Sequence, residues 1–114
     1  MIVIIDYGMG NLGSIYNMIK KLGYNSVISS DIELIQQATK LVLPGVGAFD
    51  NGINNLNKYG IVPVLEKQVI EKKVPILGIC LGMQLLTNSS EEGNCKGLGW
   101  INASTIRFKF EDSK

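Results

Sequence analysis

The sequence has no histidine at any of its 114 positions, and several other residue types are scarce. It has two cysteines, three prolines and one tryptophan, and aromatic residues make up 7% of the chain. Without histidine, the chain offers no imidazole as a general base or metal ligand. Cys80 and Cys95 are not in a metal-ligand spacing, and two cysteines do not make the framework of a secreted disulfide-rich domain. We therefore expect no metal site and no disulfide scaffold.

Clustered charge and long apolar runs are also missing. Eleven basic and ten acidic residues are interspersed and give a net charge of +1. Nucleic-acid footprints and basic membrane-binding patches both need clustered positive charge, so we expect neither kind of partner. The opening apolar run ends at Asp6, too early for a signal peptide or a membrane span. With 46% apolar residues and a mean hydropathy of +0.18, we expect one folded, cytoplasmic domain over residues 1–114.

Short apolar runs alternate with amphipathic segments along the chain. Runs of this kind, separated by helices, indicate an α/β domain with a mostly parallel sheet and helices on both of its faces. Apolar spacing and flanking turn residues set the expected bounds. We expect strands at residues 2–5, 25–29, 41–43 and 74–79, an edge strand at 101–110, and helices from Asn11 or Ser14 to Leu22, over 61–72, and over 81–86.

Three glycine-rich turns follow predicted strands, at residues 8–13, 44–47 and 78–82, where parallel sheets bind ligands. The third, Gly78-Ile-Cys80-Leu-Gly82, has the G-x-nucleophile-x-G pattern of a nucleophile elbow. Both glycines are expected because a Cβ at either position would clash in so tight a turn. Cys80 would also lie at a helix N-terminus, which favours the thiolate. From the bare pattern, a buried free cysteine between two packing glycines is an equally good explanation.

The wider context of this turn resembles a known family. Residues 74–86 resemble the nucleophile segment of class I, triad-type glutamine amidotransferases, and Leu41-Val-Leu-Pro-Gly-Val-Gly47 resembles their oxyanion strand. The opening Ile5-Asp-Tyr-Gly-Met-Gly-Asn-Leu12 narrows the resemblance to the glutaminase subunits of imidazole glycerol phosphate synthases. Ser89-Ser-Glu-Glu-Gly93 and Gly97-Leu-Gly99 also fit those subunits. The resemblance implies a flavodoxin-like fold and no cofactor.

The resemblance also implies catalytic roles. Cys80 matches the nucleophile that attacks the glutamine side-chain amide and forms a glutamyl thioester. The backbone N–H of Leu81 matches one oxyanion donor. That of Val46 matches the second, after a peptide rearrangement in the loop at residues 44–47. Donors of this kind contribute about 3–4 kcal/mol each in comparable acyl transfers.

Binding roles follow from the same resemblance. Gly45 and Gly47 flank the oxyanion position and match substrate-binding residues, as does Gln84, one helical turn beyond the nucleophile. Glu92 matches a residue that holds the α-ammonium group of the substrate, although a solvated loop carboxylate is the plainer interpretation. Asn11 matches a position at the interface with a barrel-shaped cyclase subunit, with which such subunits form heterodimers, but it is equally well explained as a helix cap.

The sequence departs from the family in one respect. Family members complete the triad with a histidine and a glutamate, and neither has a counterpart in these 114 residues. Cysteine catalysis needs a proton acceptor and a donor for the departing ammonia. We therefore expect the chain to be the N-terminal portion of an amidotransferase domain, truncated at its C-terminal side.

Other interpretations stay open. Gly8-Met-Gly10-Asn-Leu-Gly13 has the form G-x-G-x-x-G, and Asp31 follows the second predicted strand, as in dinucleotide-binding domains. Against this, Asp6 and Tyr7 put a charge and a bulky ring where a pyrophosphate would approach. A non-catalytic interaction module is another possibility, given the missing histidine. Within the family, a relative that supplies ammonia for surface-sugar modification would have nearly the same motifs.

Overall fold

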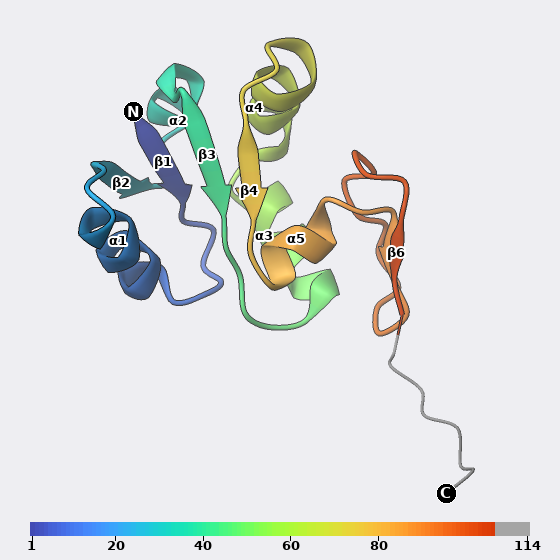
Figure 1. Cartoon of the computed structure of the whole chain (residues 1–114). Helices are drawn as coiled ribbons and strands as arrows, with labels where there is room; N and C mark the ends of the chain where they lie inside the picture. Colours follow the sequence, from blue (N-terminus) through green and yellow to red (C-terminus); the bar gives the residue numbers. More distant parts are fainter. Residues whose placement is uncertain (107–114) are drawn as a thin grey trace, which may run out of the picture.

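The computed structural model describes residues 1–106, in which short strands alternate with helices (Figure 1). Four strands form the main sheet and two very short strands form a second sheet. In chain order the elements are β1 (Ile2–Ile5), α1 (Leu12–Lys21), β2 (Ser26–Ser29), α2 (Ile32–Gln37), β3 (Lys40–Leu43), α3 (Phe49–Lys58), α4 (Val62–Glu66), the π-helix η1 (Lys67–Glu71), β4 (Ile76–Gly78), α5 (Leu81–Leu85), β5 (Ser89–Ser90) and β6 (Ser104–Thr105).

The main sheet has the order β2-β1-β3-β4, and every neighbouring pair is parallel. Val3 is level with Val27 on one side and with Leu41 on the other. Leu43 is level with Gly78, so β3 and β4 end together. The parallel sheet predicted from the apolar runs is confirmed, and the carboxyl ends of its strands lie along one edge.

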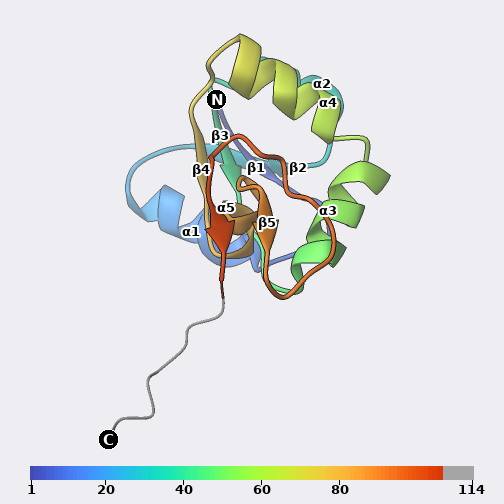
Figure 2. The ribbon, with the colours of Figure 1, turned by 90° about the vertical axis from the view of Figure 1, so that its right-hand side faces the viewer.

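Helices cover both faces of the sheet, as predicted. Figures 1 and 2 show α1 on one side and α2, α3 and α4 on the other. Side chains alternate between the faces of a strand. Val3, Ile5, Leu41 and Leu43 accordingly point into one core with residues of these three helices, including Ile35, Leu56 and Leu65. Packing on this face is tight enough to leave each of these side chains at most 1% exposed.

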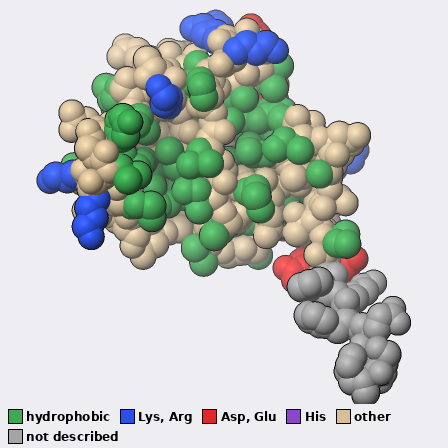
Figure 3. Space-filling model, viewed as in Figure 1, with side chains coloured by type: hydrophobic (Ala, Val, Ile, Leu, Met, Phe, Trp, Pro, Cys, Tyr) green, Lys and Arg blue, Asp and Glu red, His purple; other side chains and the backbone are tan. Residues whose placement is uncertain are grey.

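The face that carries α1 is only partly covered. A groove runs between α1 and β4, and its lining includes Leu22, Tyr24 and Leu77. These three side chains are 69%, 63% and 59% exposed. Apolar side chains gather over this part of the surface in Figure 3. Among residues 1–106, no helix is both long and apolar enough to cross a bilayer.

The helix predicted over residues 61–72 is confirmed, but its second half is the π-helix η1 rather than an α-helix. Gln68 is 1% exposed there, and its amide nitrogen donates to the carbonyl oxygens of Ile35 at 2.9 Å and Ala38 at 3.4 Å. The chain then turns back, with Val74 N–H donating to the Gln68 carbonyl at 2.8 Å. The Gln68 side chain therefore bonds to the end of α2 from within the π-helix. Apolar spacing predicts neither the π-helix nor these hydrogen bonds.

The edge strand predicted over residues 101–110 is wrong where the structure describes it. Only Ser104–Thr105 is a strand, and it pairs with β5 rather than with the main sheet. The N–H groups of Trp100 and Ile101 both donate to the Leu86 carbonyl, and the Ala103 N–H donates to the Ile101 carbonyl. These amides therefore form hydrogen bonds within turns and are not available to pair with a neighbouring strand. Residues 107–110 lie outside the described part of the chain.

Candidate active site

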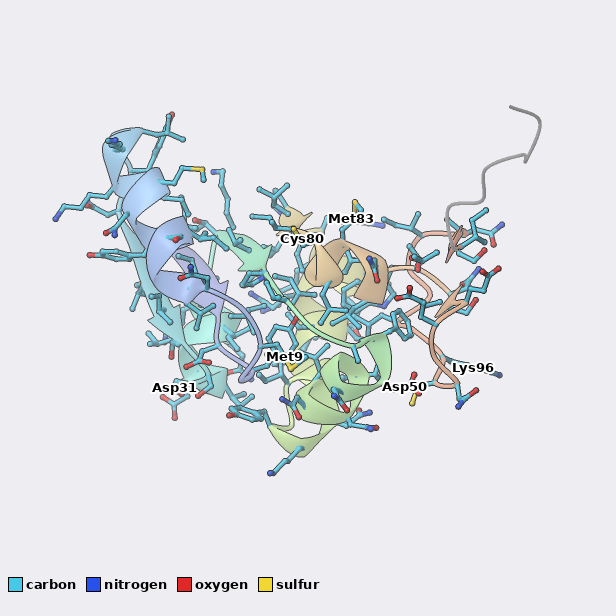
Figure 4. All side chains as sticks on the ribbon, turned by 90° about the horizontal axis from the view of Figure 1, so that it is seen from below. Met9, Asp31, Asp50, Cys80, Met83 and Lys96 are labelled. Atoms are coloured by element: carbon cyan, nitrogen blue, oxygen red, sulfur yellow. The ribbon has the colours of Figure 1, made fainter. Side chains whose placement is uncertain are left out.

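Three loops meet at the carboxyl edge of the main sheet, after β1, β3 and β4. Figure 4 looks onto this edge, where Cys80 and Met83 mark the start of α5 and Met9 lies on the loop after β1. These are the loops that contain the three glycine-rich turns of the sequence. The edge is therefore the place where the fold brings the three glycine-rich turns together.

Cys80 joins β4 to α5 in an unusual backbone conformation, with φ 53° and ψ −120°. Within residues 1–106 only Lys73 is a second non-glycine residue with positive φ. Strain of this kind persists only where surrounding contacts impose it. Here the Gly82 N–H donates to the Ile79 carbonyl at 2.9 Å, and the Gln84 N–H donates to the Cys80 carbonyl at 3.2 Å. The cysteine itself is exposed, and its thiol is free.

The two glycines of this turn are required by their neighbours. A Cβ on Gly82 would overlap the carbonyl oxygen of Leu43 and lie 2.6 Å from its carbonyl carbon. A Cβ on Gly78 would lie 2.7 Å from Cα and 2.9 Å from N of Met83. All three distances are to backbone atoms, which cannot move aside as a side chain can. The prediction that both positions exclude a side chain is confirmed, and Cys80 is not the buried cysteine of the alternative interpretation.

The backbone amide of Leu81, an expected oxyanion donor, is already hydrogen bonded. It donates to the carbonyl oxygen of Gly45 at 3.1 Å. This contact joins the loop after β3 to the first residue of α5. Val46, the residue after Gly45, is 67% exposed. An oxyanion would therefore compete with the Gly45 carbonyl for the Leu81 amide, and the peptide rearrangement that the resemblance implies stays a prediction.

The loop after β3 is also held from the side of β1. Tyr7, the second residue after β1, is fully buried, and its hydroxyl donates to the Pro44 carbonyl at 2.5 Å. Burial raises the pKa of Tyr7, so its hydroxyl keeps its proton. A Cβ on Gly10 would lie 3.1 Å from the Cα of Gly45. The sequence predicts neither the Tyr7–Pro44 hydrogen bond nor the contact of Gly10 with Gly45, because in each pair the two residues are far apart along the chain.

The predicted substrate-binding residues lie in three places: the loop after β3, α5 and the loop after β5. Gln84 is half-buried on α5, and α5 packs against β5. Glu92 is exposed in the loop after β5, where its N–H donates to the Ser90 hydroxyl at 3.3 Å. Gly47 has a φ of +135°, and a Cβ there would lie 2.7 Å from the methyl carbon of Met9.

The loop that carries Glu92 is fastened by Asp50, which sequence reasoning missed. Its carboxylate accepts the N–H of Asn94 at 3.0 and 2.9 Å and that of Cys95 at 2.8 Å. These N–H groups, with that of Asn94 foremost, hold the pKa of Asp50 below its usual value. Burial raises the pKa of Cys95, and Asp50 adds to the effect. In Figure 4 Asp50 lies on α3 and faces this loop.

The G-x-G-x-x-G segment has a structural explanation that needs no phosphate. Gly8 and Gly10 have φ values of +82° and +113°, and Gly10 packs against Gly45. Asn11 is exposed and caps α1, accepting the Ser14 N–H at 3.4 Å. Asp31 caps α2 by accepting the Glu33 N–H at 3.0 Å. In residues 1–106 no three His, Cys, Asp or Glu side chains are grouped so that they could hold a metal ion.

Comparison with known proteins gives a consistent assignment. A model of the family described as glutamine amidotransferase class-I matches residues 3–111. Imidazole glycerol phosphate synthase subunit HisH 2 of Methanococcus maripaludis is 62% identical over 112 residues, which is 98% of this chain and 55% of the relative. The protein of the same name from Pseudomonas aeruginosa is 51% identical over 114 residues, 100% of this chain and 56% of its own length.

The chain thus spans about half the length of the curated relatives it matches. A solved structure described as a crystal structure of glutamine amidotransferase resembles the fold with a TM-score of 0.73. That match covers 92% of this chain and 56% of the other, at 21% sequence identity. At this identity the likeness supports the fold alone.

Proposed function

This chain belongs to the class-I glutamine amidotransferase family, and on that premise we propose that its site hydrolyses the side-chain amide of glutamine through a thioester on Cys80. The observation that carries the proposal is the turn at Cys80. An exposed thiol lies on a strained residue between two glycines that tolerate no side chain. Strain is retained at positions where the surrounding structure imposes it, and such positions cluster at active sites.

The chemistry requires two steps that balance. The Cys80 thiolate adds to the amide carbon of glutamine, and the carbonyl π electrons move onto the oxygen. Collapse of this oxyanion expels the nitrogen, which takes a proton and leaves as ammonia, and a glutamyl thioester remains. Water then attacks the thioester, releasing glutamate and restoring the thiol. Each tetrahedral intermediate has an oxyanion that needs N–H donors.

Leu81 and Val46 are the proposed donors, with Gly45 and Gly47 lining the same space. The Leu81 amide becomes available when the Gly45–Val46 peptide turns and withdraws its carbonyl oxygen, and the same rotation directs the Val46 N–H toward the oxyanion. We assign Gln84 to the substrate's polar groups and Glu92 to its α-ammonium group. The hydrogen bonds that Asp50 makes support the second assignment, because they restrict the loop on which Glu92 lies.

The proton for ammonia has no evident donor among these 114 residues, which contain no histidine. A substrate with a leaving group that needs no proton should avoid this difficulty. We therefore expect the chain to form the thioester from an activated γ-glutamyl ester. We expect no sustained ammonia release from glutamine, because loss of the base from related triads removes most of the rate, on the order of a millionfold.

The acceptor of the ammonia is proposed from the names of the relatives. Both are called subunits of imidazole glycerol phosphate synthase, which favours histidine biosynthesis over surface-sugar modification. We propose a cytoplasmic heterodimer in which this glutaminase, a hydrolase, passes ammonia to a cyclase subunit with a barrel fold, so that the complex as a whole acts as a lyase. Asn11 is the proposed contact, since it is exposed at the edge where the site lies.

The test compares two p-nitrophenyl esters of similar reactivity, one γ-L-glutamyl and one acetyl, with peptide mass as the readout. We expect Cys80 to be acylated at least tenfold faster by the glutamyl ester, and Cys95 to show no preference. Cys80→Ala should remove the fast reaction, and Cys95→Ala should leave it intact. Equal rates with both esters at Cys80 would refute a glutamine site.

A further inference from the structure

Tyr7 is a buried polar side chain to which the proposed chemistry gives no role. Its ring is fully buried in the core formed by β1, β3 and the helices behind them. The residue is fixed at two points. Its hydroxyl donates to the Pro44 carbonyl at 2.5 Å, and its own carbonyl accepts the side-chain amide of Asn55 at 3.0 Å. The hydroxyl therefore has little freedom to leave Pro44.

The Pro44 carbonyl belongs to the peptide next to the one that has to turn. The Gly45 carbonyl accepts the Leu81 N–H at 3.1 Å and so occupies the donor. Withdrawing it requires rotation about ψ of Gly45 and φ of Val46, and neither rotation displaces the Pro44 carbonyl. At the Cα of Gly45, the moving peptide is thus bonded to the Pro44–Gly45 peptide, which Tyr7 holds in place.

The space around Gly45 points to the same arrangement. A Cβ on Gly45 would overlap the Tyr7 hydroxyl and lie 3.0 Å from the Cβ of Leu81. The hydroxyl and Leu81 therefore both lie close to Gly45, on the side where a side chain would project. Catalytic donors must be held to within about 0.5 Å of their productive positions, and that precision comes from neighbouring groups that are themselves fixed.

We propose that Tyr7 is a positioning residue for the oxyanion site, whose hydroxyl holds Pro44 so that only the Gly45–Val46 peptide turns. This role rests on the function proposed above, and it concerns a residue that does not itself touch the substrate. The simpler alternative is a core tyrosine whose hydroxyl only satisfies a buried carbonyl. The two differ in what removing the hydroxyl does at Leu81, on the opposite side of the loop.

The test uses Tyr7→Phe, which keeps the ring and removes one oxygen, and Tyr59→Phe as a matched control. The Tyr59 hydroxyl lies near Gly8 in the same region. Amide hydrogen exchange by NMR is followed at Leu81 and at Ile79, whose N–H donates to the Leu43 carbonyl at 2.9 Å. We expect exchange at Leu81 to be at least tenfold faster in Tyr7→Phe and unchanged at Ile79, with neither amide affected in Tyr59→Phe.

The second readout separates oxyanion-dependent from oxyanion-independent chemistry at Cys80. Acylation by the γ-glutamyl ester needs the donors, whereas displacement of iodide from iodoacetamide does not. We expect Tyr7→Phe to slow acylation about fivefold to tenfold and to leave alkylation within twofold of the original chain. Acylation that is unchanged or faster, or a Leu81 amide that exchanges as before, would overturn the proposal.

The two hypotheses can fail separately. If the original chain shows no glutamyl preference, the proposed function fails and the role of Tyr7 in catalysis fails with it, whatever the exchange data give. If the preference is present and the γ-glutamyl ester acylates Tyr7→Phe as fast as it acylates the original chain, only the role of Tyr7 is refuted. Should Tyr7→Phe not fold, 3-fluorotyrosine in place of tyrosine provides a stronger donor. Exchange at Leu81 should then slow, and an unchanged or faster rate would count against the proposal.

Discussion

The carboxylate of Asp50 accepts the backbone N–H of Cys95 at 2.8 Å and so joins the first turn of α3 to the loop after β5. The neighbouring N–H of Asn94 contacts both carboxylate oxygens. A Cβ on Gly93 would lie 3.1 Å from the carboxyl carbon, so the loop backbone approaches as closely as glycine allows. Two segments separated by more than forty residues are thereby held together beside the candidate site.

The first prediction concerns the pH dependence that Asp50 gives to stability. Its pKa is lowered in the folded chain by the N–H groups of Asn94 and Cys95. The stabilisation is therefore complete above the ordinary carboxyl pKa of about 3.9 and is lost as the pH falls through the lower, folded value. In urea unfolding followed by circular dichroism, we expect Asp50→Asn to have a lower midpoint than the original chain at pH 7. The difference should shrink below pH 4, and a constant difference would contradict the assignment.

The second prediction compares the two thiols. Cys80 is exposed, whereas Cys95 is half-buried and its pKa is raised by burial and by Asp50. Because the thiolate is the reacting form, iodoacetamide at pH 7.5 should alkylate Cys80 at least tenfold faster than Cys95. Peptide mass measures both in one sample. Asp50→Asn serves as the control, since it should speed the alkylation of Cys95 alone. Faster alkylation of Cys95 than of Cys80 in the original chain would contradict the assignment of Cys80 as the reactive thiol.

The strands were predictable because a buried parallel strand is a continuous apolar run. Residues 2–5 were predicted without error, and 41–43 to within one residue of β3. By contrast, α3 was missed because four of its ten residues are asparagine and a fifth is glycine, all weak helix formers. Its buried side chains, Ile53 and Leu56 among them, supply the stability that propensity lacks.

The site was predictable in part for a related reason. The two glycines and Cys80 lie within five residues, so one local pattern contains the whole turn. The contacts of Tyr7 with Pro44 and of Asp50 with Cys95 join residues 37 and 45 positions apart. Only the folded sheet brings such residues together, and no spacing rule for a single sequence could have paired them.

The third prediction contrasts two glycines. Gly82→Ala would press a methyl group into the Leu43 carbonyl, a backbone group fixed by the sheet. We expect a loss of at least about 3 kcal/mol in the free energy of unfolding, at the upper end for single substitutions. Gly13 is within α1 and has no atom within 4 Å of its virtual Cβ, so Gly13→Ala should stabilise by about 0.5–1 kcal/mol. Urea unfolding of both variants checks this, and a tolerated Gly82→Ala would disprove the packing.

The fourth prediction is a double-mutant cycle. Gly45→Ala places a Cβ that overlaps the Tyr7 hydroxyl, and Tyr7→Phe removes that oxygen. Each single change should destabilise the chain, by about 1–3 kcal/mol for the buried carbonyl left unpaired in Tyr7→Phe. Combined, they should cost less than the sum by at least about 1 kcal/mol, since residues in contact are not additive. The remaining contact with Leu81 prevents full rescue. Strict additivity would mean that the two groups do not share this space.

The last prediction decides between the two interpretations of the loop at residues 8–13. If this loop bound a pyrophosphate, NAD would stabilise the chain, and at 100 times its Kd it would add about 2.7 kcal/mol. The loop instead places Gly10 against Gly45, and Asn11 caps α1. We therefore expect 5 mM NAD to leave the melting temperature unchanged and the amide NMR signals of residues 8–13 in place. Sodium chloride of equal ionic strength is the control for general salt effects. A melting temperature raised by NAD but not by the salt, with shifts confined to residues 8–13, would assign the loop to phosphate binding and remove Asn11 from the proposed partner interface.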